Sequence, residues 1–241
     1  MYIILFILML ISTNVLIIVN GIGIMPATII FKCLSSILFI AVARCSYKRN
    51  PSNTKFFALM LAGLIFSSGG DMFLAFDKNN GIFFVAGVAS FSIAHIMYSL
   101  GYCSMTGFSL KDILIFSGFF IPTCFIVVFG NFEFNGLKLL VVFYSAIISF
   151  MVSKAVSMLK YYSDSKKAVS LMVSGSVLFF ISDWVLLFLF FYPNAASSLQ
   201  AVNWMLYYTG QGLLGLSFSC TLEKDMQVIL PEKDNNGKIF I

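Results

Sequence analysis

Eight long apolar runs follow one another along this chain, and no other feature of the sequence constrains its fold as strongly. A helix needs about 20 predominantly apolar residues to cross the hydrocarbon core of a bilayer. The connections between the runs are short, so no segment remains for a soluble domain. The sequence therefore predicts an all-α membrane protein with eight transmembrane helices. The runs cover roughly residues 1–20, 26–46, 56–76, 82–103, 112–129, 137–159, 168–192 and 199–220.

The composition agrees with this prediction. Of 241 residues, 60% are hydrophobic and only 10% are charged, whereas a soluble domain averages about 25% charged residues. The first run lacks the basic start and small-residue cleavage site of a signal peptide, so we expect it to be a true span. We therefore expect one transmembrane domain, residues 1–220, followed by a polar cytoplasmic tail, residues 221–241.

The lysines and arginines are distributed unevenly between the two sides of the predicted spans. Three lie on one side: Lys32, Lys78 and Lys138. Cationic residues concentrate on the cytoplasmic side of membrane proteins, so both termini are expected to be cytoplasmic. The distribution of the +5 net charge thus indicates orientation, and we infer no affinity for nucleic acid from it. The twelve on the other side are Arg44, Lys48, Arg49, Lys55, Lys111, Lys154, Lys160, Lys166, Lys167, Lys224, Lys233 and Lys238.

Two aspartates lie deep inside predicted spans, Asp71 within SGGDMFLAF and Asp183 within ISDWVLLF. A charge at the bilayer centre costs roughly 2.5–3.5 kcal/mol on insertion scales, so such residues face a cavity or a partner. Each aspartate lies about fifteen residues, or about 22 Å of helix, from the cytoplasmic end of its span. The side chains are therefore too deep to reach water. Either both serve function, or they only lock helices together, as neutral carboxylic acids or by bonding to Ser67 and Ser182.

A constant offset in residue number relates several positions in the third and fourth runs to positions in the seventh and eighth. Four spans separate the copies, and an even number gives a parallel repeat with a pseudo-twofold axis along the membrane normal. The sequence thus indicates a 4+4 internal repeat, although convergent packing is the alternative. Such a repeat would place the two aspartates at equal depth, facing each other. The matched pairs are Gly63 and Gly175, Asp71 and Asp183, and His95 and Tyr207.

Other polar groups in the same four runs predict a polar pocket. His95 and Tyr98 share a helix face because they lie three residues apart, although a lone histidine is also a common packing partner. Tyr207 and Gln211 lie one turn apart on the eighth run, with Tyr208 beside them. Gly70 either lets two helix backbones approach closely or leaves room for a ligand.

Three cations lie inside or near the ends of spans, and they need a separate explanation. We expect Arg44 and Lys154 to extend their side chains to the cytoplasmic surface. Lys32 either extends to the opposite surface or neutralises one of the aspartates. The five cysteines form no CxxC pair, so neither a disulfide framework nor a thiolate metal site is indicated.

Four motifs, in this order, carry a resemblance to a known family: GDMFLAF (70–76), SFSIAHIMYSLGY (90–102), GSVLFFISDWVLL (175–187) and YYTGQGLL (207–214). The sequence resembles the YhhN-like family of membrane proteins, whose characterised animal members are lysoplasmalogenases. The resemblance implies hydrolysis of the vinyl ether of a lysoplasmalogen to a fatty aldehyde and a glycerophospho-ethanolamine or -choline. It implies no cofactor. The partners are then a lysophospholipid substrate and the bilayer, which would be the inner membrane in a bacterium.

The residues suit that chemistry. A vinyl ether hydrolyses when an acid protonates its β-carbon and water captures the resulting oxocarbenium ion, which resembles the intermediate of glycoside hydrolysis. Two carboxyls in a low-dielectric site can supply one protonated acid and one anion. Asp71 and Asp183 are the catalytic candidates, and the sequence leaves open which is the acid. The candidates for binding or orienting substrate are Lys32, Gly70, His95, Tyr98, Ser182, Tyr207, Tyr208 and Gln211.

Two other functions also fit the sequence. A proton-coupled transporter could use the aspartates as proton carriers. A metal-dependent lipid hydrolase could use His95, Asp71 and Asp183 as ligands, since catalytic zinc takes three protein ligands. We expect no metal, because one histidine with two carboxylates is a thin ligand set.

Overall fold

A computed structural model describes residues 1–51, 53–77 and 81–222. This part of the chain is entirely helical, with eight α-helices and no strand. The predicted tail, residues 221–241, falls almost wholly outside the described residues. The helices are α1 (Tyr2–Ile22), α2 (Met25–Arg49), α3 (Thr54–Ala75), α4 (Ile82–Thr106), α5 (Leu110–Phe129), α6 (Lys138–Tyr161), α7 (Lys166–Phe191) and α8 (Ser198–Ser217).

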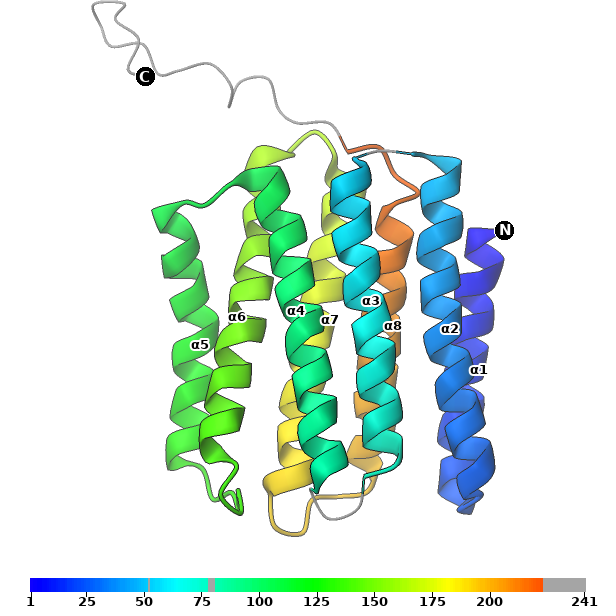
Figure 1. Cartoon of the computed structure of the whole chain (residues 1–241), viewed down its shortest axis with the longest axis vertical. Helices are drawn as coiled ribbons and strands as arrows, with labels where there is room; N and C mark the ends of the chain where they lie inside the picture. Colours follow the sequence, from blue (N-terminus) through cyan, green and yellow to red (C-terminus); the bar gives the residue numbers. More distant parts are fainter. Residues whose placement is uncertain (52, 78–80, 223–241) are drawn as a thin grey trace, which may run out of the picture.

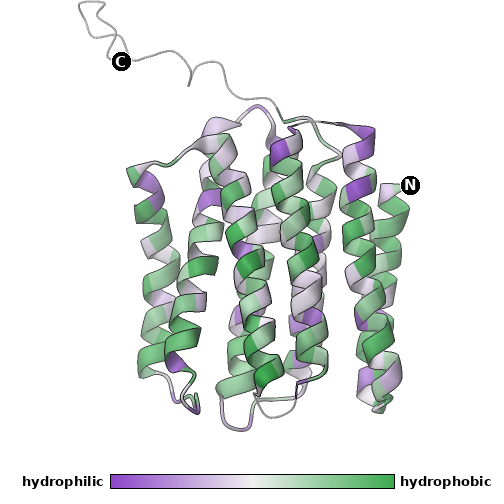
Figure 2. Ribbon diagram, viewed as in Figure 1, coloured by the Kyte–Doolittle hydropathy of each residue, from purple (hydrophilic) through white to green (hydrophobic). Residues whose placement is uncertain are grey.

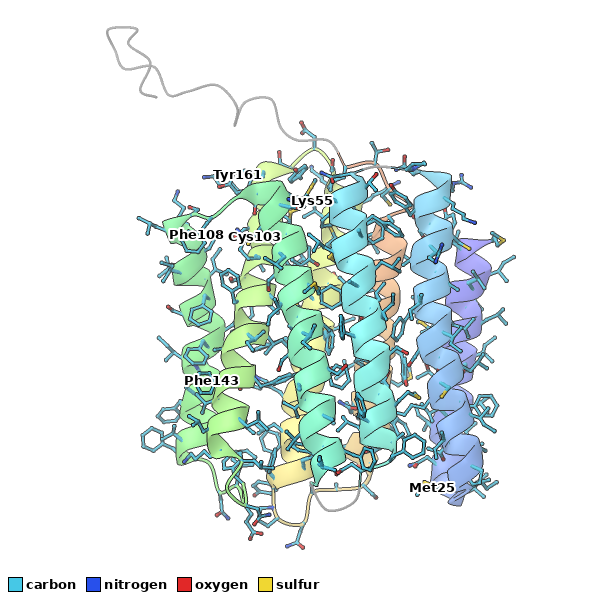
Figure 3. The ribbon with its side chains drawn as sticks, in the orientation of Figure 1. Met25, Lys55, Cys103, Phe108, Phe143 and Tyr161 are labelled. Carbon is cyan, nitrogen blue, oxygen red and sulfur yellow. The ribbon has the colours of Figure 1, made fainter. Side chains whose placement is uncertain are left out.

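Successive helices run in alternate directions and form one bundle (Figure 1). The N-terminus and the end of α8 therefore lie at the same end of the bundle. The last turns of α2 and α6 also lie there and carry Lys48, Arg49 and Lys160. Figure 3 labels Lys55 and Tyr161 near this end and Met25 at the opposite end.

Hydrophobic residues predominate along the helices (Figure 2), and many of the exposed side chains are large and apolar. On α1, six isoleucine side chains are at least half exposed, and Phe143 of α6 is 63% exposed. Apolar side chains arranged around a bundle in this way match the hydrocarbon of a bilayer. We conclude that this is a multi-pass membrane protein. The six isoleucines are Ile3, Ile4, Ile7, Ile11, Ile18 and Ile22.

Seven of the eight described helices are long and apolar enough to cross a membrane, and α8 is the exception. It has 20 residues, the length of a span, but carries Asn203, Gln211 and two adjacent tyrosines. These polar side chains are buried, because α8 packs against α1, α2 and α7 inside the bundle. The prediction of several membrane helices is confirmed, and the eighth span stays a prediction.

The packing of the helices has a twofold pattern. The contacting pairs in the first half are α1–α2, α2–α3, α3–α4 and α2–α8. When four is added to each helix number, these become α5–α6, α6–α7, α7–α8 and α6–α4, and these pairs are also in contact. The contacts also agree in register. Gly63 packs against the ring of Tyr98, and Gly175 packs against the backbone of Gly210, which are the matching positions of the second half. This agreement is expected for the 4+4 repeat, which stays a prediction.

The expectation for Lys154 is wrong. Its side chain is fully buried instead of reaching the surface. Its Nζ lies 2.7 Å from Asp112 Oδ2 and donates to the carbonyl of Gly107 at 2.6 Å. Asp112 sits in the first turn of α5, where a capping box with Ser109 fixes its carboxylate beside α6. A partner at the helix end therefore holds the lysine inside the bundle. Arg44, by contrast, is exposed as predicted.

Candidate functional site

Asp71 of α3 and Asp183 of α7 line the same cavity, which has a volume of about 230 Å³. Its wall comes mainly from α2, α3, α7 and α8, and includes Lys32 and Tyr207. Met25, at the start of α2, also lines it, so the cavity lies toward the end of the bundle opposite the termini. Both aspartates thus line one cavity, whereas their equal depth and direct opposition stay predictions.

Asp71 is buried and accepts two hydrogen bonds at the same oxygen. Ser36 of α2 donates to Oδ2 at 2.7 Å, and Tyr207 of α8 donates at 2.9 Å. Ser67 is not its partner, because the Ser67 hydroxyl lies 3.4 Å from that of Tyr98. The carboxylate therefore joins α3 to α2 and α8, instead of bonding within its own helix.

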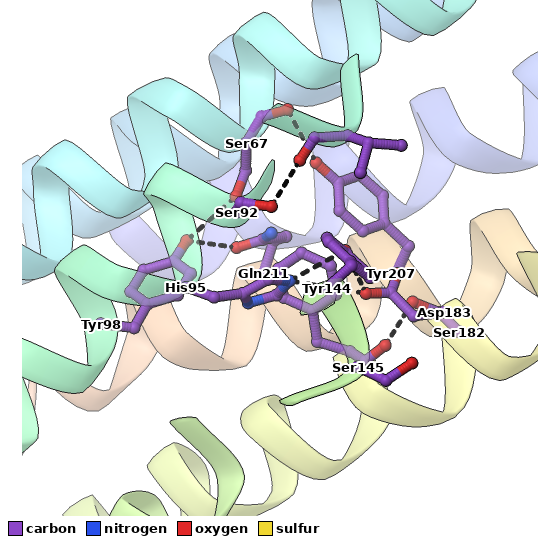
Figure 4. Close-up of polar contacts among 12 residues, drawn as sticks. Ser67, Ser92, His95, Tyr98, Tyr144, Ser145, Ser182, Asp183, Tyr207 and Gln211 are labelled. Carbon is purple, nitrogen blue, oxygen red and sulfur yellow. Dashed lines mark hydrogen bonds and ion pairs between the residues drawn. The ribbon is translucent and has the colours of Figure 1, made fainter. Parts of the chain in front are cut away.

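Asp183 has a different environment (Figure 4). The Tyr144 hydroxyl of α6 donates to Asp183 Oδ2 at 2.5 Å, and His95 Nε2 of α4 lies 3.5 Å from the same oxygen. His95 Nε2 also lies 3.0 Å from the Tyr144 hydroxyl, so the three side chains form a triangle. The side chain of Asp183 is 10% exposed, whereas that of His95 is fully buried. The expected bond from Ser182 is absent, because that hydroxyl donates to the carbonyl of Phe179.

A third polar group lies behind this cavity. Tyr98 donates to Gln211 Oε1 at 2.8 Å, and Tyr208 donates to the carbonyl of Lys32 at 3.3 Å. The side chains of Tyr98, Gln211 and Tyr208 are completely buried, and none belongs to the cavity lining. The predicted clusters on α4 and α8 do meet, but within them Tyr98, Tyr208 and Gln211 connect helices and do not line either cavity. Any role of these residues in substrate binding would be indirect and stays a prediction.

Gly70 serves close packing. A Cβ at this position would lie 2.6 Å from the Phe91 ring of α4, which is too close for any side chain. Of the two explanations for this glycine, the structure supports the approach of two helices and gives no space for a ligand.

Lys32 does not extend to the surface, so that expectation is wrong. The residue is 8% exposed and lines the cavity with the aspartates. Within the described part of the chain, its ammonium has no carboxylate oxygen within 4.0 Å. It therefore shares the cavity with Asp71 and Asp183 without forming a direct ion pair with either.

A second cavity adjoins the first. It is narrow, about 60 Å³, and lies among α4, α5, α6 and α7 with an almost wholly apolar wall that includes Val88 and Val141. Asp183 lines both cavities and therefore marks the place where polar and apolar spaces meet. The side chains common to both walls are Leu74, Phe91, Asp183, Leu186 and Phe190.

Sequence reasoning missed Tyr144 and Ser36. Both helices carry several other hydroxyl residues, so no motif singles these two out. The offset that carries Asp71 onto Asp183 could have found one of them, because it also carries Lys32 onto Tyr144. It carries Ser36 onto Ile148, so the second copy has no counterpart of that hydroxyl.

The metal hypothesis required three ligands in one place. His95 lies beside Asp183, but Asp71 is held by Ser36 and Tyr207 instead. Across the residues that the structure describes, no three His, Cys, Asp or Glu side chains gather as a metal site would require.

The fold and the site define a class: a multi-pass helical membrane protein with two buried aspartates on one internal cavity. The comparison with protein families makes the assignment specific. Residues 27–218, which include α3, α4, α7 and all but the first residues of α2, match the model of the YhhN family. The chain belongs to the YhhN family, as the four motifs indicated. No solved structure matches the chain.

Proposed function

We propose that this protein is a membrane-embedded hydrolase that cleaves the vinyl ether bond of lysoplasmalogens. One observation carries the proposal: the carboxyl group of Asp183 lies where a polar cavity meets an apolar one. A lysoplasmalogen has the same division, with a glycerophospho head group, a single hydrocarbon chain and the vinyl ether between them. With the head group in the polar cavity and the start of the chain in the apolar one, the vinyl ether lies at Asp183. The rest of the chain would extend between helices into the bilayer, since the apolar cavity is short.

The environments of the two aspartates support different roles. Asp71 accepts two hydroxyl hydrogen bonds at one oxygen, so two oriented O–H dipoles already point at it. Asp183 accepts one hydroxyl hydrogen bond, which Tyr144 donates to Oδ2. Its other oxygen is then available to carry a proton toward the cavity. We assign Asp183 as the acid and Asp71 as the anion that stabilises developing positive charge.

The reaction then proceeds in three steps. Asp183 transfers its proton to the β-carbon of the vinyl ether, and the electron pair of the double bond forms the new C–H bond. Water adds to the α-carbon of the oxocarbenium ion and gives a proton back to Asp183. The hemiacetal collapses to a fatty aldehyde and the free hydroxyl of the glycerophospho-base, so one water is consumed in total. Tyr144 and His95 position Asp183 during these steps.

The proposal includes an orientation in the membrane. Eight spans with both termini cytoplasmic place the Lys- and Arg-rich end of the bundle inside the cell. The polar cavity then lies in the opposite half of the bilayer, because Met25 and the start of α2 are at that end. Residues 1–220 form the membrane domain and residues 221–241 the tail. In a bacterium the location would be the inner membrane.

Aldehyde release from purified protein tests the function. The protein, in a maltoside detergent, would be given lysoplasmalogen and, separately, a saturated lysophospholipid of equal chain length. We expect a long-chain aldehyde from the first substrate only. Absence of aldehyde would contradict the proposal. Uptake into liposomes that depends on a pH gradient, without aldehyde, would favour the proton-coupled transporter instead.

A further inference from the structure

Lys32 is a charged residue in the wall of the polar cavity, and the proposed mechanism gives it no role. Among the described residues, its ammonium group makes no hydrogen bond or ion pair. The charged side chains that line this cavity are Lys32, Asp71, Asp77 and Asp183. Asp71 and Asp183 are bound by hydroxyl groups, and Asp77 accepts from the backbone N–H groups of Gly81 and Phe84. The carboxylates therefore have hydrogen-bond donors of their own.

Lys32 has no such partner. It is 8% exposed, and no carboxylate among the described residues lies within 4.0 Å of its Nζ. An ammonium group that lies in a low-dielectric cavity without a carboxylate in contact is stabilised less than one in water or in an ion pair. An anion that enters the cavity would restore that stabilisation. The site therefore favours a ligand with a negative charge beside its uncharged parts.

We infer that Lys32 binds the phosphate of the lipid head group. This inference rests on the proposed function for the identity of the lipid. A phosphodiester carries one negative charge and several acceptor oxygens, which suit the three N–H donors of an ammonium group. The glycerol backbone separates this phosphate from the vinyl ether, so one molecule can reach Lys32 and Asp183 across the same cavity. Lys32 thus selects phospholipids over uncharged ether lipids with the same chain.

Binding of two uncleavable analogues tests this inference. One is a saturated 1-O-alkyl lysophosphocholine, and the other is the 1-O-alkylglycerol of equal chain length, which lacks the phosphate. Binding would be measured in a maltoside detergent, since it carries no phosphate. The variants are Lys32→Gln, which removes the charge, and Lys32→Arg, which keeps it. Lys138→Gln is the matched control, because Lys138 is exposed at the same end of the bundle as the cavity.

We expect the wild-type protein to bind the phosphate-containing analogue about tenfold more tightly than the alkylglycerol. Lys32→Gln should abolish this preference and leave alkylglycerol binding unchanged, which also shows that the variant folds. Lys32→Arg and Lys138→Gln should keep the preference. A preference that survives in Lys32→Gln, or that is absent from the wild type, would overturn the inference.

Two further results separate this inference from the proposed function. Neither analogue contains a vinyl ether, so the preference is measured whether or not the protein cleaves lysoplasmalogen. Inorganic phosphate is the third probe, and it should not displace the phosphocholine analogue because it lacks the chain. Displacement that is lost in Lys32→Gln would assign the site to free phosphate and overturn its assignment to a lipid.

Discussion

Asp71 and Asp183 lie on helices four apart in chain order, α3 and α7, yet both line one cavity. Each accepts a hydrogen bond from a tyrosine on another helix, but the two tyrosines are not counterparts in the repeat. Tyr207, which bonds to Asp71, corresponds to His95, and Tyr144, which bonds to Asp183, corresponds to Lys32. The surroundings of the two carboxylates thus differ although their positions match. The mechanism that we propose uses this difference, with Asp183 as the acid and Asp71 as the anion.

Replacing either aspartate tests the proposed roles. In Asp183→Asn we expect aldehyde release to fall by about 10²–10⁴-fold, the range for loss of a general acid. Asp71→Asn should also lose activity, because no anion then faces the oxocarbenium ion. Steady-state rates measure both effects. Glu133→Gln removes an exposed carboxylate and should leave the rate unchanged. Wild-type rates in both aspartate variants would refute the mechanism.

Tyr144→Phe tests whether Tyr144 positions Asp183. We expect kcat to fall about tenfold with little change in KM, because the hydroxyl holds the acid without binding the head group. In an Asp183→Asn background the same change should have no further effect, since interacting residues are not additive. Tyr102→Phe is the control, because its buried hydroxyl bonds to Ser176 away from both cavities. Equal losses in the two variants would indicate a general effect on packing.

The sequence predicts the membrane helices well and the site partners only in part: Tyr207 and His95 are candidates, whereas Ser36 and Tyr144 are not. Apolar runs identify helices because length and hydropathy alone determine a span. Asp71 and Asp183 are recognisable because charge is expensive in hydrocarbon. Their partners Ser36 and Tyr144 are hydroxyl residues, which are tolerated in any membrane helix and therefore give no signal. These hydrogen bonds depend on which helices pack side by side. Helix packing is not determined by the residues next to Ser36 or Tyr144 in the sequence.

The same reason explains the error on Lys154. A lysine near the end of a span normally reaches water along the lipid surface. Here Asp112, on the preceding helix, lies close enough to keep the charge inside. No local pattern around Lys154 indicates that partner, and only the packing of α5 against α6 supplies it.

This buried ion pair yields a prediction about stability. Lys154→Met should lower stability by about 3–5 kcal/mol, because it leaves the Asp112 carboxylate buried and unpaired. Adding Asp112→Leu should recover part of the loss, since two apolar side chains need no partners. Thermal unfolding in detergent would compare these variants with Lys160→Met, which removes an exposed lysine from the same helix. A single variant as stable as the wild type would contradict the structure at this position.

The close contact between α7 and α8 yields another prediction. A Cβ at Gly175 would lie 2.8 Å from the carbonyl oxygen of Gly210, which is backbone and cannot move aside cheaply. Gly175→Ala should therefore destabilise the protein by about 1–3 kcal/mol. Gly118 of α5 is the matched control, because a Cβ there meets nothing within 4 Å. If the two alanine variants unfold at the same temperature, α7 and α8 are not packed as described.

A larger side chain in the apolar cavity tests whether this cavity holds the hydrocarbon chain of the substrate. Val88 of α4 lines this cavity, and Val88→Phe would occupy space that we assign to the first carbons of the hydrocarbon chain. Each buried CH₂ contributes about 0.8 kcal/mol, so excluding two or three should raise KM by about tenfold or more. Val85→Phe is the control, because Val85 lies on the same helix and is 40% exposed. A raised KM in Val88→Phe alone would place the chain in this cavity. An unchanged KM in Val88→Phe would mean that the chain leaves the site by another route.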